Sequence, residues 1–491
     1  MVAGAVAVEN KKRGVATGVK TMYNNHRKST KRRNDLNYYE YLDQLQKKYG
    51  TTNTELLEEL AASGIRISKS NLSHKLKGQR RMTDEELDVF IQTVCPTGAE
   101  EKTLRTLYKV SQFGEEQYKE VEVIRRGVAG LSDASVIRVP EDLPEPVDHT
   151  DIRGEKPLTD MILSILRDAW GRGAVLVQCP ADFTALYDAI CAHSFRCASE
   201  VKHLICIDNS TGNSSEFDYV QAVFSADKLA RYNIAYEVRY YYDHVNLVGN
   251  GFVPFPFYLV TDRFLLLIAH DFKSGFLLRD DKVIARYREE FNRIYSKCQP
   301  LLRRTYGVME SLWTLAGLEE SCTKHFYVLR HGVSYLQGFD NTMLQTCVPE
   351  DLPEREDLIS MLKRKISTSA SSAGCVLHTD TDADAFLQTG VLMDLPSSMM
   401  LPVPRFDRAA MIRRASQAKS RSRRVTSGYL EISPHTSVSC YDSGTVTLVH
   451  AGAEPHCFLI TEHKFYSAVR SFFLYLLDHE SVSDQFDEII R

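Results

Sequence analysis

Two helix-start patterns in the first hundred residues constrain the fold of this chain more than any other feature. Each pattern is a Thr followed three residues later by a Glu, at Thr52–Glu55 and at Thr83–Glu86. In such a capping box, the two side chains bind backbone N–H groups that the first helical turn leaves without partners. Apolar residues follow each box at helical spacing: Leu56, Leu57 and Leu60, then Leu87, Phe90, Ile91 and Val94. The sequence therefore predicts two amphipathic helices close together.

The segment between these helices, Ser68–Met82, predicts a third and more polar helix. With Ser68 as its N-terminal cap, Leu72 and Leu76 fall on one face. The other face carries Ser70, Asn71, His74 and Lys77. Gly78 is expected to end the helix, because glycine readily adopts the left-handed conformation of a helix C-terminus. Tyr38, Leu42, Leu45 and Tyr49 indicate an earlier helix, so the module has four to five helices.

This pattern resembles the phage-repressor-like (Cro-type, XRE-like) helix-turn-helix domain of transcriptional regulators. The resemblance covers residues 35–111, about a sixth of the chain. In that family one helix crosses the DNA backbone and the next enters the major groove. The connection Ala61–Ser68 is longer than the family's usual turn. The resemblance implies that double-stranded DNA is a partner and that the protein is a homodimer.

The resemblance also implies two sets of DNA contacts. The residues placed to read base edges are Lys69, Ser70, Asn71, Ser73 and His74. Asn can pair with adenine through two hydrogen bonds, Lys can reach guanine, and Ser can serve either base. The residues placed to bind phosphate are Lys77, Gln79, Arg80 and Arg81. An alternative interpretation is a four-helix bundle whose exposed face is merely basic.

Composition and charge suggest five segments. They are a flexible basic arm (1–34), the helix-turn-helix domain with a helical extension (35–131), a Pro-rich acidic linker (132–156), an α/β domain expected to act as a sensor (157–300) and a second mixed α/β region (301–491). Residues 1–36 hold nine Lys or Arg against Glu9 and Asp35, whereas the whole chain has a net charge of −4. Attraction to nucleic acid is therefore expected only near the N-terminus. The arm is either a DNA-binding extension or a solvated tail.

Beyond the linker, helical and strand patterns alternate, which predicts an α/β fold. A weak internal repeat is interpreted either as a coincidence, which its short length favours, or as a sign that this region consists of two lobes. Phe257-Tyr-Leu-Val-Thr-Asp-Arg-Phe264 resembles Cys457-Phe-Leu-Ile-Thr-Glu-His-Lys-Phe465, and each is followed by an acidic, aromatic segment. The basic run Arg405–Arg424 is interpreted either as a second phosphate-binding surface or, as its Ser-rich end favours, as a solvated loop.

The sequence offers one enzymatic alternative. The apolar segment Tyr327–Leu329 ends in Arg330-His331-Gly332, which is similar to the signature of histidine phosphatases, and His450 could supply that family's second His. The resemblance implies a His that takes the phosphoryl group and an Arg that neutralises its oxygens. The alternative function is therefore a phosphate-ester hydrolase with an N-terminal nucleic-acid-binding module.

The sequence predicts no cofactor and no metal site. Asp380-Thr-Asp382-Ala-Asp384 begins like a calcium loop, but Ala385 and Val391 stand where that loop needs Gly and Glu. Cys191, His193, Cys197 and Cys206 lack the spacing of a zinc site.

The eleven irregularly spaced cysteines indicate reduced thiols. The apolar run Phe264–Ala269 is too short to cross a bilayer, and the apolar residues Val2–Val8 precede the positive charges, unlike a secretory signal. We therefore expect a cytoplasmic protein with no membrane partner. The favoured function is a transcriptional regulator whose α/β region responds to an unknown small-molecule or protein effector.

Overall fold

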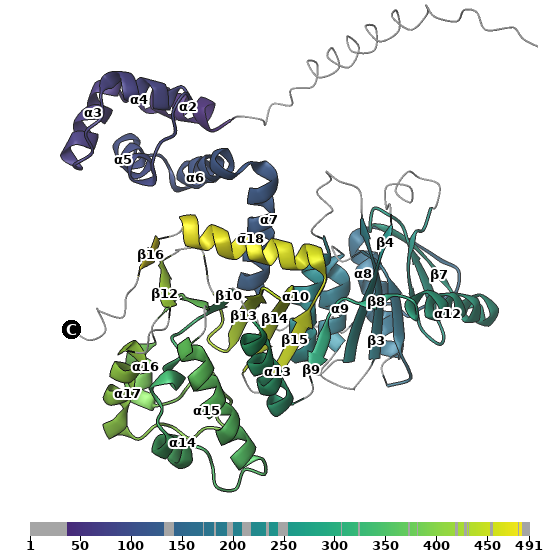
Figure 1. Cartoon of the computed structure of the whole chain (residues 1–491). Coiled ribbons are helices and arrows are strands. Elements are labelled where there is room, and N and C mark those ends of the chain that lie inside the picture. The colour runs from purple at the N-terminus through teal and green to yellow at the C-terminus, as the bar shows by residue number, and fades with distance from the viewer. Residues whose placement is uncertain are drawn as a thin grey trace, which may run out of the picture. The chain divides into compact units, whose positions relative to one another are not determined.

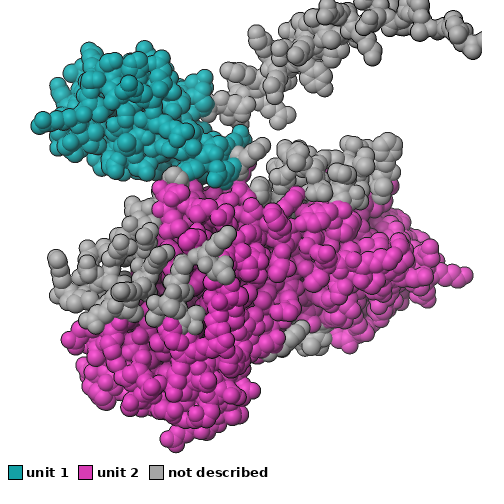
Figure 2. All heavy atoms as spheres, in the orientation of Figure 1, with its two compact units in different colours: residues 1–118 teal, residues 119–491 magenta. Residues whose placement is uncertain are grey.

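The computed structural model describes residues 37–483 with internal gaps, and the chain divides into two compact units, residues 1–118 and 119–491 (Figure 2). The gaps are residues 132–141, 170, 181–182, 194–199, 209–217, 232–234, 244–253, 306, 323–324, 372–373, 381, 418–420, 427–429, 431, 452–454 and 480. The predictions about the basic arm (1–34) and about Cys197 lie outside the described residues, as do the side chains of Cys191 and His193.

The described part of the first unit is helical throughout. Its helices are α2 (Tyr38–Tyr49), α3 (Asn53–Ala62), α4 (Lys69–Leu76), α5 (Asp84–Val94), α6 (Gly98–Phe113) and the start of α7 (Glu115–Gly130) (Figure 1). Both predicted capping boxes are present, and two more begin α2 at Asn37–Glu40 and α6 at Thr97–Glu100. The all-helical N-terminal region that the sequence predicts is thereby confirmed.

The core of this unit is formed by one apolar side of each helix. Leu42, Leu56, Leu72, Leu87 and Leu104, one from each of α2 to α6, are all almost completely buried. Each helix is short, and an isolated helix of this length is marginal in water. The helices therefore depend on this shared core for their stability.

The second unit contains two mixed sheets and confirms the predicted α/β region. The strands of the first sheet are β1 (Thr150–Arg153), β2 (Val175–Gln178), β3 (Glu200–Asp208), β4 (Ala235–Asp243), β5 (Phe257–Val260), β6 (Leu265–Ile268), β7 (Ser274–Leu278) and β8 (Gln299–Pro300). Those of the second are β9 (Arg303–Thr305), β10 (Phe326–Arg330), β11 (Cys375–His378), β12 (Arg421–Thr426), β13 (Thr436–Tyr441), β14 (Thr445–His450), β15 (His456–Ile460) and β16 (Ser481–Ser483).

Helices pack against both sheets. Those that accompany the first sheet are α8 (Glu155–Ala169), α9 (Thr184–His193), α10 (Asp218–Arg231) and α12 (Asp281–Tyr295). In the second half, α13 (Val308–Ser321) and α18 (His463–His479) pack on the sheet. The helices α14 (Asn341–Cys347), α15 (Arg355–Ser371), α16 (Ala383–Thr389) and α17 (Arg405–Gln417) pack mainly on one another, on α13 and on a 3-10 turn at Tyr335–Gly338. We call these two halves of the second unit the first lobe and the second lobe.

The two lobes have the same strand order. The first sheet runs β1-β7-β6-β5-β2-β3-β4-β8, and the second, from the matching edge, runs β9-β15-β14-β13-β10-β11-β12-β16. In each sheet, three central strands are parallel, namely β2-β3-β4 and β10-β11-β12. The remaining neighbours are antiparallel. This correspondence shows that the region is a structural duplication.

The duplication extends to the start of one helix in each lobe. The carboxylate of Asp280 accepts hydrogen bonds from the N–H groups of Lys282 and Val283 at the start of α12. Glu462 does the same for Lys464 and Phe465 at the start of α18. The repeat is therefore β7 with α12 against β15 with α18. The expected match of Phe257–Phe264 to Cys457–Phe465 was wrong, because the former begins with β5, whose counterpart is β13.

Contacts join the two lobes. The hydroxyl of Tyr242, from β4, donates to the same Glu462 carboxylate that caps α18. The ring of Phe224, from α10, lies 6.0 Å from that of Phe465.

Gly127 of α7 approaches Phe224 so closely that an added Cβ would lie 2.1 Å from the ring. Only glycine fits there without a shift of its neighbours.

Two sequence-based boundaries and one interpretation of a segment change. Residues 150–156 of the expected linker belong to the first lobe, because β1 pairs with β7 and α8 begins at Glu155. The end of the expected helical extension, from Lys119, belongs to the second unit. The described parts of the basic run Arg405–Arg424 are not a loop, since residues 405–417 form α17 and residues 421–424 form the start of β12. Within it, Arg408 donates to the carbonyls of Val403, Leu387 and Gln388.

No helix in the described parts of the chain has both the length and the apolar character needed to cross a membrane.

A buried histidine makes the first lobe sensitive to acid. His203 of β3 is 1% exposed, with Nε2 2.8 Å from the carbonyl oxygen of Cys179 and Nδ1 2.8 Å from the hydroxyl of Tyr236. Burial lowers the pKa of His203 to about 4. Between about pH 6.5 and pH 4, the unfolded chain therefore binds a proton at this imidazole that the folded chain excludes. The free energy of unfolding falls as the pH is lowered through this range, and above pH 6.5 the imidazole is neutral in both states.

We expect the melting temperature of the full chain to fall as the pH is lowered from 7 to 4.5, with His203 contributing a loss of about 2 kcal/mol. The melting temperature of His203→Gln should be lower than that of the wild type at pH 7. It should fall less than the wild-type value between pH 7 and 4.5, as calorimetry can measure. His270→Gln, at an exposed histidine of the same lobe, is the matched control. If the melting temperatures of His203→Gln and of the control depended equally on pH, His203 would not be a source of the acid sensitivity.

Candidate nucleic-acid interface and ligand cavity

Helix α4 is attached to the core by one face and exposes polar side chains on the other. Leu72 is 1% exposed, and the neighbouring Lys75 is 9% exposed. Leu76, expected to share the buried face, is only half-buried. Of the residues expected to read bases, Lys69, Ser70 and His74 are exposed, and Asn71 and Ser73 are half-buried. Those expected to bind phosphate, Lys77, Gln79, Arg80 and Arg81, are all exposed.

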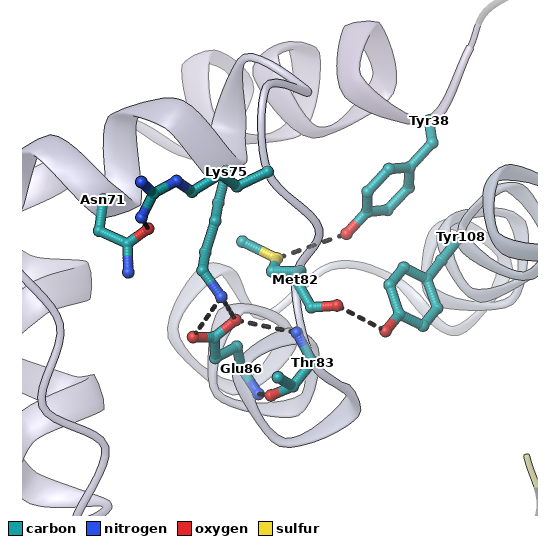
Figure 3. A network of polar contacts seen from close by, with 8 residues as sticks. Tyr38, Asn71, Lys75, Met82, Thr83, Glu86 and Tyr108 are labelled. Carbon is teal, nitrogen blue, oxygen red and sulfur yellow. Dashed lines mark hydrogen bonds and ion pairs between the residues drawn. The ribbon is translucent and has the colours of Figure 1, made fainter.

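An ion pair in the core fixes α4 to α5. Lys75 Nζ lies 2.8 and 2.5 Å from the two carboxylate oxygens of Glu86, and both side chains are almost completely buried (Figure 3). Glu86 also accepts from the backbone N–H of Thr83 at 2.9 Å, as the capping box requires. One carboxylate therefore starts α5 and binds α4. A buried charge is tolerated only when it is paired and hydrogen-bonded, as this one is.

The turn that follows α4 is fixed at two points. Gly78 has a φ of 74° and packs on Tyr39, where an added Cβ would lie 2.8 Å from the ring. Met82 receives a hydrogen bond at Sδ from the hydroxyl of Tyr38 and one at its carbonyl from Tyr108, at 3.4 and 2.9 Å (Figure 3). Arg80 and Arg81 therefore project from a turn that α2 and α6 position. The prediction that Gly78 follows the helix end is confirmed.

Polar contacts also order the exposed side chains. Arg80 Nη1 donates to Asn71 Oδ1 at 3.1 Å, and the ring of His74 is hydrogen-bonded to Gln79. Each contact joins a residue expected to read bases to one expected to bind phosphate. The Arg80 contact holds the Asn71 amide in a defined orientation but occupies the oxygen that adenine recognition would use.

The charge around α4 has one sign. Residues 60–83 contain six Lys or Arg and no Asp or Glu. Lys75 is neutralised by Glu86, which leaves Arg66, Lys69, Lys77, Arg80 and Arg81 exposed. Such a local basic surface attracts the DNA backbone whatever the net charge of the whole chain.

The second lobe contains a cavity of about 150 Å³. Apolar residues of α13 and of β10 and β11 line it, among them Leu312, Leu315, Phe326, Val328 and Val376. Its polar lining includes Arg330, Ser334, Asp394, His435, His450 and His456. An apolar enclosure with a few polar groups is the usual form of a small-molecule site.

The three residues of the enzymatic alternative, Arg330, His331 and His450, do not form one site. Arg330 Nη2 lies 2.5 Å from Asp394 Oδ1, and Ser334 donates to the same carboxylate. His450, the last residue of β14, lies opposite Thr436 of β13, and its ring stacks on that of His456 at 5.3 Å. Arg330 and His450 thus line one cavity, whereas His331, which is not among the lining residues, pairs with Asp382. Asp382 raises the pKa of His331.

Sequence analysis did not find the roles of Lys75, Asp382 or Asp394. Lys75 carried a usable signal, because it lies three residues after Leu72 and therefore on the buried face of the helix. Asp382 was noticed only as part of a rejected calcium loop, and neither Asp382 nor Asp394 is close to its partner along the chain. The pairing of β10 with β11 brings Asp382 to the end of the sheet where His331 lies.

Comparisons with known proteins leave the family open. No family model and no curated protein matches the chain. Among solved structures, TrmBL2, an archaeal chromatin protein, has 15% identity and a TM-score of 0.22 over 54% of this chain and 100% of its own. Phosphatidylserine synthase of Haemophilus influenzae has 12% identity and a TM-score of 0.24, over 72% and 92%. Polyphosphate kinase of Porphyromonas gingivalis has 11% and 0.21, over 65% and 48%. Scores this low carry no functional argument.

The Lys75–Glu86 pair provides a stability test. We expect Lys75→Met to destabilise the N-terminal unit by about 3 kcal/mol, because it leaves a buried carboxylate without its counter-charge. The double variant Lys75→Met/Glu86→Leu should lose less than the sum of the two single variants, as denaturant unfolding of the full chain can measure. Lys102→Met, at an exposed lysine of α6, controls for the loss of charge. Strictly additive losses would contradict a direct interaction.

Proposed function

We propose that the chain is a DNA-binding transcriptional regulator, with α4 and the turn after it as the DNA-contacting surface. The observation that carries this proposal is the combination on α4 of a buried attachment and an exposed, acid-free polar face. A helix of eight residues, Lys69–Leu76, can enter a major groove when its outward side chains are free to reach base edges. The connection from Ser63 to Ser68 joins it to α3 and is longer than the usual turn of the resembled family.

The two sets of side chains have separate tasks in this proposal. Lys69, Ser70, Asn71, Ser73 and His74 read base edges, and Lys77, Gln79, Arg80 and Arg81 bind phosphate. Arg80 exchanges its bond to Asn71 for a phosphate, which frees the Asn71 amide to pair with adenine. A homodimer in which two copies of α4 read neighbouring half-sites completes the proposal.

The α/β region is the regulatory part in this account. Its cavity fits a small molecule with an apolar body and a polar end that hydrogen-bonds to the Arg330–Asp394 pair. Because that pair neutralises itself, an uncharged polar end suits the site better than a strong anion. The hydrolase alternative has less support, since phosphate binding would require Arg330 to leave Asp394.

We expect full-length protein to enrich a defined sequence from random DNA duplexes. On that sequence, Asn71→Ala should weaken binding about 6- to 150-fold and relax the preference at one base pair, since a good bidentate contact contributes about 1–3 kcal/mol. Arg81→Ala should weaken binding to all sequences alike and reduce the salt dependence by about one counterion. Fluorescence anisotropy at several salt concentrations separates the two effects.

The matched control is Lys102→Ala, which removes an exposed positive charge from α6. It should leave the preferred sequence and its affinity unchanged. Failure to enrich any sequence, together with equal effects of Lys102→Ala and Arg81→Ala, would overturn the proposal and support a helical bundle with a basic face.

The effector cavity has its own test. Leu312→Trp should fill part of the cavity with a larger side chain. Small metabolites that raise the melting temperature of the wild-type protein should then fail to do so in the variant. Trp313→Leu, at the exposed neighbouring position of α13, is the control. Equal stabilisation of Leu312→Trp and wild type would place the effector elsewhere.

A further inference from the structure

Three side chains with metal-ligating atoms meet at one end of the second sheet. His331 follows β10, and Asp380 and Asp382 follow β11. One ligating atom from each lies within 4.8 Å of the other two. The parallel pairing of β10 with β11, which sets Arg330 beside His378, brings their carboxyl ends together.

The chain after β11 is folded around His331. The backbone N–H groups of Thr379 and Asp380 both donate to the carbonyl oxygen of His331, at 3.0 and 2.8 Å. Asp382 has a φ of 51°, a left-handed conformation that is uncommon outside glycine. It occupies the N-terminal cap of α16, yet its side chain makes no capping hydrogen bond. The carboxylate instead faces His331, with Oδ1 3.3 Å from Nε2.

The second oxygen of this carboxylate is buried and unsatisfied. Asp382 Oδ2 has no hydrogen-bond partner among the described residues. It lies against Gly332, where an added Cβ would be 2.1 Å away. A buried carboxylate oxygen without a partner is costly, so its environment calls for a donor or a cation. The missing Cβ of Gly332 leaves the space that this carboxylate occupies.

The imidazole of His331 presents a ring nitrogen to the cluster. Nε2 faces the carboxylate of Asp382. Imidazole nitrogens and carboxylate oxygens are both common ligands of transition-metal ions. Asp380 is exposed, so a cation can reach the site from solvent.

We propose that His331, Asp380 and Asp382 bind a divalent transition-metal ion. One imidazole and two carboxylates are a ligand set that suits Mn²⁺, Fe²⁺ or Zn²⁺. Ca²⁺ prefers oxygen ligands alone, and Cu⁺ prefers thiolates and thioethers. The ion joins the end of β10, the loop after β11 and the start of α16. This site departs from the sequence-based prediction of no metal, and it stands whether or not the chain binds DNA.

Mn²⁺ is the appropriate probe, because the chain's cysteines compete poorly for it. Titration of metal-free full-length protein, followed by the electron paramagnetic resonance signal of free Mn²⁺, should show a saturable site. Asp382→Asn and His331→Ala should each weaken binding at least 10-fold. Asp380→Asn, a surface change that leaves the fold intact, should weaken it as well.

Asp384→Asn is the matched control, because it removes an exposed carboxylate from the same helix outside the cluster. It should bind Mn²⁺ like the wild type. Circular dichroism checks that each variant is folded. Absence of a saturable site in the wild type, or Asp380→Asn binding as tightly as Asp384→Asn, would overturn the proposal and leave His331–Asp382 as an ordinary ion pair.

Discussion

The buried pair between Lys75 and Glu86 is the interaction on which the N-terminal unit depends. Glu86 satisfies the first turn of α5 through Thr83 and neutralises a lysine from α4 with the same carboxylate. Removing either partner would leave a charge or an unpaired N–H inside a small helical core, where little apolar surface is available to offset it. The orientation of α4, and with it the direction of its exposed side chains, follows from this contact.

The two lobes of the second unit share an architecture but differ in the polar groups that they carry. Both lobes repeat one strand order, and both begin their last long helix with an acidic side chain on backbone N–H groups. In the second lobe that side chain, Glu462, also binds Tyr242 of the first. The cavity and the His331–Asp380–Asp382 cluster both belong to the second lobe. The two lobes thus share one framework, but these two groups of polar residues lie in the second lobe.

Local features of the sequence were sufficient for much of the fold. The boxes at Thr52 and Thr83, the glycine after α4 and the alternation beyond the linker depend on near neighbours, and each is present in the structure. The burial of Lys75 was not predicted, because charged residues are rarely buried without a partner, and its partner Glu86 had been explained by the cap alone. Asp382 depends on β10 pairing with β11, a long-range fact with no local signal.

We propose above all that α4 and the turn after it form a DNA-binding surface. Amide hydrogen exchange of the full chain, with and without the DNA duplex that it enriches, tests this most directly. The account predicts slower exchange over residues 66–83 when DNA is bound, with α3 (Asn53–Ala62) changing less. Protection confined to the α/β region, with residues 66–83 unchanged, would contradict it.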